Sequence, residues 1–498
     1  MKRISKSLKL VLGALAFCLL YLPVNGNNIQ ISNVALTGQN TLQNYYMVQF
    51  DISWENSWRT STHESNYDAA WIFIKYTVKN EQDWQHANLN YVNGQSDGHI
   101  APPGGTIRSA SNNNSTGVGV FLFREADGIG DVNFQNVQLR WNYGTLGDNQ
   151  AVEVSVHAVE MVYVPQGSFY LGDGMSDFGQ FQQGTTGQPY LVSSEAQITL
   201  GGGGANSLGN SNAANQQYTD DFDDNTSQTL PTAFPKGYNA FYCMKYEISQ
   251  DQYGEFLAHL SQSQRTERTE VIYVNNTNVY PIETGNHYAV PENPYRAMDY
   301  MNWADCAAYA DWAGLRPMSE MEYEKACRGP QEAVAEEYAW GNDSWYLEGI
   351  YELSNEGKTN EMISNGIGKN VGNANSVSIY QGWGRPLRCG IFAASAENKT
   401  REETGATYWG IMEMTGNCYE RIISVGNSQS RDFSGLHGDG VLTSSGNASF
   451  SVLLNWGFVS AVGVGFRNSE ISQRYLINTT DSERNRSYGF RAVRTANH

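Results

Sequence analysis

The side chains that could carry redox or transition-metal chemistry in this sequence are six cysteines and eight histidines. Cys18 lies in an apolar N-terminal run, and the others are Cys243, Cys306, Cys327, Cys389 and Cys418. Their separations are not those of a zinc site, and five cysteines are too few for a disulfide scaffold in a chain of 498 residues. An odd number also leaves at least one thiol without an intramolecular partner. We therefore expect most of them to be small buried hydrophobic residues.

A glycine run and an aspartate cluster are two further candidates for ligand binding. The run at 201–204 lacks the strand, helix and lysine of a phosphate-binding loop. The cluster Asp220, Asp221, Asp223 and Asp224 lacks the central Gly and distal Glu of a helix-loop-helix calcium site. Both belong to a segment rich in Gly, Gln, Asn and Ser at 173–235. This segment is expected to be a flexible surface insertion, with the aspartates in a solvated loop.

The first 26 residues have the layout of a secretory signal peptide. Four basic residues precede an apolar run at 10–22, Pro23 ends that run, and Val24 and Gly26 provide small residues at a cleavage site. A lipoprotein signal processed at Cys18 is the alternative, which the bulky Phe17 disfavours. No later segment has 18 uninterrupted apolar residues. The mature protein is thus expected to be secreted, periplasmic or at the cell surface, without a membrane span.

The charge balance excludes one class of partner. The chain has 32 basic and 51 acidic residues, a net charge of −19, and removal of residues 1–26 with their four basic residues makes it −23. Such a chain repels nucleic acid, because basic side chains supply most of that binding. Its 12 Trp and 30 Tyr favour a protein or carbohydrate ligand, since rigid aromatic rings provide contact area at little entropic cost.

Two regions of different hydrophobic pattern predict an α+β chain. Alternating apolar residues predict strands at 46–54, 72–78, 118–122, 137–143 and 152–156, and hence a β-sandwich-like domain over 27–158. From about 159 the pattern changes to loops with three helices, which begin at Ser249, Asn302 and Ser319. Each of these is followed three residues later by a residue that can complete a capping box: Gln252, Asp305 and Glu322.

Seven short segments of the second region follow one another in a known order. They lie at 161–169 (MVYVPQGSF), 241–249 (FYCMKYEIS), 303–314, 316–324, 340–342 (WGN), 414–420 (MTGNCYE) and 489–491 (GFR). In this order they resemble the formylglycine-generating enzyme, or sulfatase-modifying factor, family. The resemblance implies a loop-rich variant of the C-type lectin fold over 159–498.

The resemblance also implies a chemistry for which this chain lacks the residues. Family enzymes oxidise a substrate cysteine with two cysteines near the C-terminus, which bind copper; the matching positions here are near Asn468 and Gln473. Amides do not replace soft thiolates as copper ligands, so copper is not expected. The His-x3-His-x-Glu cluster of the related iron enzymes is absent from the sequence as well.

A calcium site is the cofactor that the resemblance retains. Its ligands would be the side chains of Glu413 and Glu420 and the backbone carbonyls of Gly416 and Cys418, a set of oxygens that suits a hard cation. The alternative is a turn capped by Glu420 without a metal.

Fold alone does not give function, and two classes stay open. The favoured one is a non-catalytic binding or structural protein of the cell envelope. The other is a formylglycine-generating-type oxidoreductase that uses relocated thiols, Cys389 or Cys418. Whether two thiols lie close enough to share a metal discriminates between them.

Overall fold

The computed structural model describes residues 28–496 except for 82, 113–115, 176–178, 212–219, 267, 269–292, 347–350, 376–385, 450–456, 460–469, 475–481 and 485–486. The predicted signal peptide at 1–26 lies outside the described residues. Strands outnumber helices in the described part of the chain, which confirms the mixed α+β class. None of the helices described there has the length and apolarity that crossing a bilayer requires.

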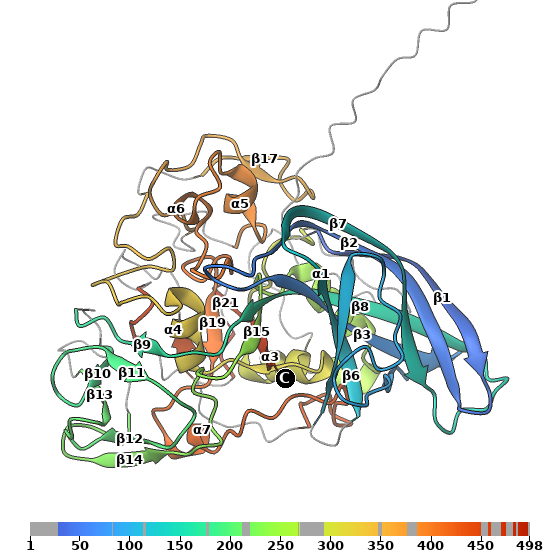
Figure 1. Ribbon diagram of the computed structural model, residues 1–498, viewed down its shortest axis with the longest axis horizontal. Helices are drawn as coiled ribbons and strands as arrows, with labels where there is room; N and C mark the ends of the chain where they lie inside the picture. The colour runs from blue at the N-terminus through green and yellow to red at the C-terminus, as the bar shows by residue number, and fades with distance from the viewer. Residues whose placement is uncertain are drawn as a thin grey trace, which may run out of the picture.

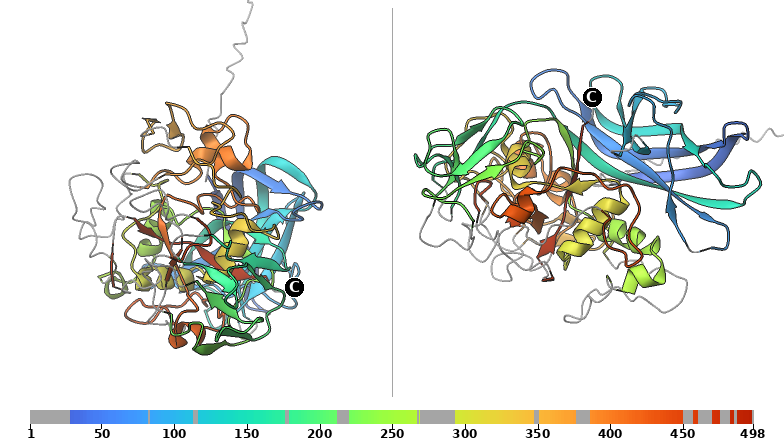
Figure 2. Two further views of the ribbon diagram at one scale, coloured as in Figure 1. Left: turned by 90° about the vertical axis from the view of Figure 1, so that its left-hand side faces the viewer. Right: turned by 90° about the horizontal axis from the view of Figure 1, so that it is seen from below.

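Three long N-terminal strands form one antiparallel sheet in the order β1-β2-β7. They are β1 (Gln30–Asn40), β2 (Tyr45–Arg59) and β7 (Gly128–Asn142). Figure 1 shows them in blue and teal at the right, and the views of Figure 2 keep the N-terminal strands together at one side of the molecule.

A larger sheet connects the N-terminal strands to the rest of the chain. Its order is β16-β22-β15-β8-β3-β6-β5, with β4 paired to β3. The strands are β3 (Asp68–Val78), β4 (Gln85–His86), β5 (Gly105–Ser111), β6 (Gly117–Arg124), β8 (Val152–Val164), β15 (Phe241–Met244), β16 (Arg316–Pro317) and β22 (Ala492–Thr495). The two halves of the sequence thus share one sheet.

The two sheets enclose an apolar core between them. Phe50 and Trp54 of β2 and Ile72 and Ile74 of β3 are at most 1% exposed and belong to one cluster with Leu139 of β7. These residues recur every second position, so each strand places them on one face. The period-two pattern predicted five of the eight N-terminal strands, and β1, β4 and β5 are additional.

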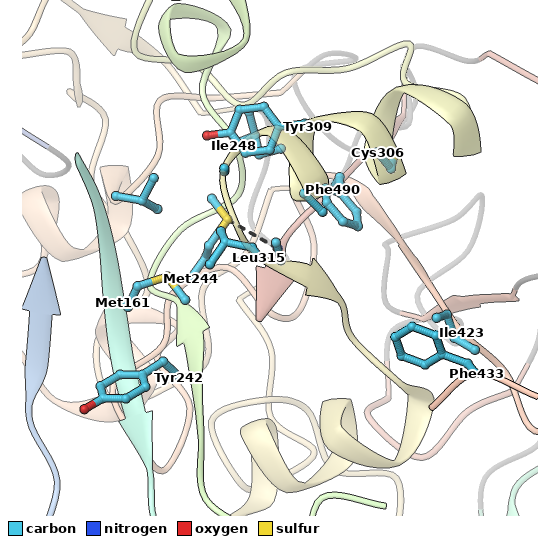
Figure 3. Packing of buried hydrophobic residues seen from close by; sticks show 14 of the residues in the cluster. Met161, Tyr242, Met244, Ile248, Cys306, Tyr309, Leu315, Ile423, Phe433 and Phe490 are labelled. Atoms are coloured by element: carbon cyan, nitrogen blue, oxygen red, sulfur yellow. Dashed lines mark hydrogen bonds between the residues drawn. The ribbon is translucent and has the colours of Figure 1, made fainter. Parts of the chain in front are cut away.

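The opposite face of the larger sheet packs on the helices. Trp71 of β3 belongs to the same cluster as Met161 of β8 and Tyr309 of α3 (Trp303–Trp312). Figure 3 shows Met161 near Tyr242 and Met244 of β15, with Tyr309 in the same cluster. The boundary predicted between residues 158 and 159 therefore lies inside β8, whose last residues pair with β15.

The three predicted helices are confirmed, with their caps. They are α1 (Gln250–Ala258), α3 and α4 (Glu320–Arg328), and each has a complete capping box at its predicted N-cap. Capping boxes satisfy free N–H groups from residues only three positions apart, which makes them readable from sequence. Four shorter helices are α2 (Gln262–Thr266), α5 (Ile391–Ser395), α6 (Arg401–Thr404) and α7 (Ser428–Arg431).

The segment at 173–235 differs from the expected flexible insertion. It contains a sheet of order β10-β13-β12-β14, drawn in green at the lower left of Figure 1. These strands are β10 (Phe181–Gln183), β13 (Leu208–Asn210), β12 (Ile198–Gly201) and β14 (Ser227–Leu230), beside the pair β9 (Phe169–Leu171) and β11 (Tyr190–Val192). Leu200, Leu208 and Phe222 are buried in the main core. The glycines permit close strand contact, since a Cβ on Gly209 would lie 2.0 Å from the Gly184 carbonyl oxygen.

The aspartate cluster in this segment is likewise not a solvated loop throughout. The side chain of Asp220 is 2% exposed and forms a 2.5 Å ion pair with Arg474. Asp221 pairs with Arg431 at 2.7 Å. Partners more than 200 positions away neutralise these carboxylates, which local sequence could not indicate.

The remaining strands are short. They are the pair β17 (Leu353–Ser354) and β18 (Met362–Ile363), and the sheet β20-β19-β21 made by β20 (Gly457–Val459), β19 (Tyr419–Ile422) and β21 (Tyr488–Gly489). The predicted calcium loop leads directly into β19 of the second of these sheets.

Candidate functional site

The predicted calcium residues lie in a tight loop that ends at β19. Glu413, Gly416 and Asn417 have φ values of 53°, 89° and 63°, so the backbone turns through the left-handed region three times within five residues. Glu420 follows on β19. The loop brings Glu413 and Glu420, both buried, to the same arginine, Arg491.

Arg491 is the resident cation of this cluster. Its guanidinium is fully buried, and Nε and Nη2 lie 2.9 and 2.7 Å from Glu420 Oε1. Its other donors reach the carbonyls of Met244, Lys245 and Met412 at 2.8–3.0 Å. Glu420 therefore accepts a paired, charge-assisted contact, which is the geometry in which buried carboxylates are stable.

A third carboxylate, Glu247, completes the cluster and was not singled out by the sequence. Glu247 Oε1 accepts a 2.8 Å hydrogen bond from the Cys418 N–H, and Oε2 accepts one from the Asn417 side-chain amide. Glu247 thus supports the loop from behind. The sequence feature that could have pointed to Glu247 is its position in the segment 241–249, which resembles the family.

The cluster contains three buried carboxyl groups whose pKa values are all raised. Burial raises the pKa of Glu247 well above its ordinary value, and the nearby carboxylate of Glu420 adds to that rise. Burial also raises the pKa of Glu420, and it raises that of Glu413 to about 7. Arg388 also acts on Glu413, so three buried carboxyl groups share two arginines, and burial favours the protonated form of each carboxyl group.

Glu413 and Glu420, the predicted side-chain ligands, each keep one oxygen without a hydrogen bond among the described residues. Glu413 Oε1 accepts a 2.9 Å hydrogen bond from the Gly390 N–H, whereas Oε2 of Glu413 and Oε2 of Glu420 are buried without a hydrogen-bond partner among the described residues. Side chains alone do not define a metal centre, because no group of three or more His, Cys, Asp and Glu within the described ranges is arranged to hold one. The predicted set takes its other two ligands from carbonyls.

Cys389 and Cys418 lie in one small cluster with Tyr246 and Ala297. Both are fully buried, and they contact carbonyl oxygens of Glu247 (3.6 Å) and Met298 (3.9 Å). Burial raises the pKa of both thiols well above its ordinary value, with nearby carboxylates as a second cause. Protonated, inaccessible thiols are poor nucleophiles and poor metal ligands.

The other thiols share these properties. Cys243, Cys306 and Cys327 are completely buried, and burial raises the pKa of each. All five are free thiols. Of the two positions that match the family's cysteine pair, Asn468 lies outside the described residues, and Gln473 is a buried amide. The described part of the chain therefore presents no accessible thiolate.

A cavity of about 600 Å³ that the sequence did not indicate lies where the N-terminal strands meet the second region. We call it the junction pocket. It is lined by residues from 56–66, which end β2 and lead to β3, by residues from 393–412, and by Lys245, Tyr246 and Gln331. Asn66 ties the two sides together, since its Nδ2 donates a 2.7 Å hydrogen bond to the Trp409 carbonyl. No local motif spans two segments so far apart.

The comparisons with known proteins identify one family. Residues 189–496, more than half of the chain, match the family described as "Sulfatase-modifying factor enzyme 1-like domain". No curated protein matches the chain. Among solved structures, the Treponema denticola variable protein 1 is similar at 11% identity with a TM-score of 0.30, over 68% of this chain and 96% of that one. The score is too low to support a structural argument, but the family match stands without it: the chain belongs to the sulfatase-modifying factor family.

Proposed function

We propose that this protein is an exported, non-catalytic member of its family that binds a protein or carbohydrate ligand at the cell envelope. The observation that carries the proposal is the state of its thiols. Oxidation of a substrate cysteine through copper needs paired soft ligands. Here the five thiols are buried with raised pKa values, and the described family position, Gln473, is an amide.

The arrangement of the two parts supports a binding role. A β-sandwich-like unit over 27–158 and a C-type-lectin-like unit over 159–498 would together present loops from both. The junction pocket is lined by loops from both parts. A recess of this kind is the usual form of a binding site for a small ligand.

A cysteine-containing sulfatase-type peptide tests this proposal. The protein is incubated with the peptide, copper, oxygen and a reductant, and mass spectrometry follows conversion to formylglycine. We expect no conversion. Conversion that is lost in Cys389→Ser or Cys418→Ser would overturn the proposal and restore the oxidoreductase. The observation in favour of that alternative is that these two thiols share one cluster.

Export is tested on the protein isolated from its native source. We expect an intact mass that begins at Asn27, because the basic and apolar start is followed by a small-residue cleavage site. A retained segment at 1–26, or an acylated Cys18 at the N-terminus, contradicts this part of the proposal.

A structural calcium ion belongs to the same proposal. Glu413, Glu420 and the carbonyls of Gly416 and Cys418 would hold it, and its charge would offset the excess of buried carboxylates. Binding only to the folded state stabilises a protein by about 2.7 kcal/mol at a hundredfold excess over Kd. We therefore expect a higher melting temperature in excess calcium than in excess chelator.

Variants assign the calcium effect to this loop. Glu420→Ala and the milder Glu413→Gln, which keeps an acceptor for the Gly390 N–H, are expected to abolish the calcium-dependent shift. Glu322→Gln is the matched control, a buried glutamate paired with Arg316 outside the loop, and it should keep the shift. An unchanged melting temperature in the parent, or an unchanged shift in both loop variants, contradicts the assignment.

A further inference from the structure

The junction pocket combines aromatic rings with polar and cationic side chains. Trp58 and Tyr408 are half-buried in its lining, and Trp409 lies below them with its ring 4.7 Å from that of Tyr408 at an angle of 89°. Asn56, Gln331, Thr60 and Thr407 add amide and hydroxyl groups. Flat apolar faces beside amides and hydroxyls match a sugar ring, which offers both C–H faces and hydroxyl edges.

The aromatic wall is held in place from behind. The buried Lys245 Nζ lies 4.9 Å from the centre of the Trp58 ring, and the indole Nε1 donates a 3.3 Å hydrogen bond to Asn66. Gly410 has a φ of 85°, and a Cβ there would lie 2.9 Å from the Trp58 ring. A ring fixed in this way needs no further ordering when a ligand stacks on it.

Two cations of the lining donate hydrogen bonds to backbone carbonyls. Lys399 is exposed, and Nζ donates to the carbonyls of Ala393 and Ala394. Arg401 donates to the carbonyls of Cys327 (3.2 Å) and Ala339 (2.8 Å), and its guanidinium lies 5.9 Å from the centre of the Tyr408 ring. Neither forms an ion pair with a carboxylate in the described part of the chain. The charges of Glu337 and Glu402 act on Arg401, whereas no carboxylate among the described residues acts on Lys399, so the local positive charge of the lining lies mainly at Lys399.

Lys245 does not add to that positive charge, because Asp68 and Glu160 lie 3.3 and 3.0 Å from its ammonium group. Glu64 is the acidic residue of the lining, and its charge acts on Tyr408. The pocket is therefore suited to a ligand with a single negative group rather than to a polyanion.

From these contacts we infer that the junction pocket binds the end of a carbohydrate chain whose terminal sugar carries one carboxylate or sulfate. The sugar ring packs against Trp58 and Tyr408, the amides of Asn56 and Gln331 bond its hydroxyls, and Lys399 and Arg401 bind the anionic group. This inference rests on the proposed binding function and supplies its ligand class. It involves neither the calcium loop nor the thiols.

Calorimetric titration of the full chain with matched disaccharides tests the inference. The probes are cellobiouronic acid, cellobiose sulfated at its terminal sugar, neutral cellobiose and a tetraglutamate peptide. We expect at least one acidic disaccharide to bind at least tenfold more tightly than cellobiose. The two acidic probes distinguish carboxylate from sulfate.

Variants place the binding in the pocket. Lys399→Ala changes an exposed side chain and should weaken binding of the acidic disaccharide about tenfold, while Lys358→Ala, an exposed lysine outside the lining, should leave it unchanged. Tyr408→Ala should weaken acidic and neutral disaccharides alike. Circular dichroism checks that each variant is folded.

Several results would overturn the inference. They are binding of no disaccharide, equal binding of the tetraglutamate, or affinities unchanged in both Lys399→Ala and Tyr408→Ala. Failure here leaves the binding-protein proposal standing with another ligand, whereas conversion of the cysteine peptide would overturn that proposal whatever the disaccharides do.

Discussion

Asp68 is a single residue that connects three strands. It is completely buried in β3 and accepts hydrogen bonds from the Trp54 indole (2.9 Å), the Ser57 hydroxyl (2.8 Å) and the Trp58 N–H (3.0 Å) of β2. The fourth donor is Lys245, which follows β15 at 3.3 Å. One carboxylate thus fixes the Trp58 side of the junction pocket to the sheet below it.

His99 is a residue whose protonation opposes folding. Its Nδ1 accepts a 2.9 Å hydrogen bond from the Arg140 N–H, and Nε2–H donates to the Asn90 carbonyl at 3.1 Å. A second ring proton would face the Arg140 N–H, and burial lowers the pKa of His99 to about 4. Between about pH 6.5 and 4 the unfolded chain binds a proton that the folded protein does not, so stability is full above pH 6.5 and falls as the pH falls.

The prediction is that His99 contributes about 2 kcal/mol of the stability lost between pH 7.5 and 5.0. His99→Asn keeps an acceptor near the Nδ1 position and cannot be protonated, so it should lose about that much less than the parent. Urea unfolding at the two pH values measures the difference. The exposed His63→Asn serves as control, and equal losses in parent and His99→Asn would refute the assignment.

The sequence predicted part of the candidate site at this scale. Glu413 and Glu420 belong to one short motif, so they could be placed together. Their partners could not be predicted, because they lie far away in the sequence. Arg491 is 71 positions from Glu420, and Glu247 is 171 positions from Cys418, whose N–H donates a hydrogen bond to it. Pairing over such distances depends on the completed fold rather than on local pattern.

At the scale of elements, β6 can approach β3 closely because of Gly119. A Cβ on Gly119 would lie 2.5 Å from two ring atoms of Trp71 and 2.8 Å from the Ile72 carbonyl oxygen. Trp71 is itself fully buried, and its indole donates a 2.8 Å hydrogen bond to the Ala313 carbonyl. The ring therefore has little room to move aside.

Gly119→Ala is predicted to destabilise the protein by about 1–3 kcal/mol, the usual cost of overpacking a close-packed interior. Gly167→Ala is the matched control, since a Cβ there meets no atom within 4 Å. Differential scanning calorimetry compares the two variants with the parent. Equal melting temperatures for the two variants would show that β6 can shift away from β3.

The elements also show where pattern reading succeeds. The helix caps at Ser249, Asn302 and Ser319 were predicted correctly because donor and acceptor are three residues apart. The small sheet at 181–230 was missed, because short strands between glycines have no measurable period. Its order comes from contacts with the core, which composition does not encode.

At the scale of the whole molecule, the larger sheet joins the two regions that differ in sequence pattern. One face of β3 packs on β2 and β7, and the other packs on α3. Neither face can be uncovered without exposing residues such as Ile72 or Trp71, which are completely buried. The structure thus favours one cooperative unit over two independent domains.

Leu139→Ala in β7 provides the test. Truncation of a fully buried leucine costs about 2–5 kcal/mol. In a cooperative molecule the amides of α3 should lose hydrogen-exchange protection to the same extent as those of β7, although α3 belongs to the other core cluster. Exchange followed by mass spectrometry gives both values. Protection of α3 that is unaffected by Leu139→Ala would show two separately unfolding domains.

The position of β22 within the larger sheet has a consequence for the order in which the protein can be made. Residues 492–495 lie between β15 and β16, and the preceding Arg491 neutralises Glu420. A ribosome that has finished residue 480 has therefore produced a sheet with an interior strand missing and a buried carboxylate without its counter-ion. The larger sheet therefore cannot be completed before residues 492–495 have been synthesised, so its folding finishes late in the synthesis of the chain.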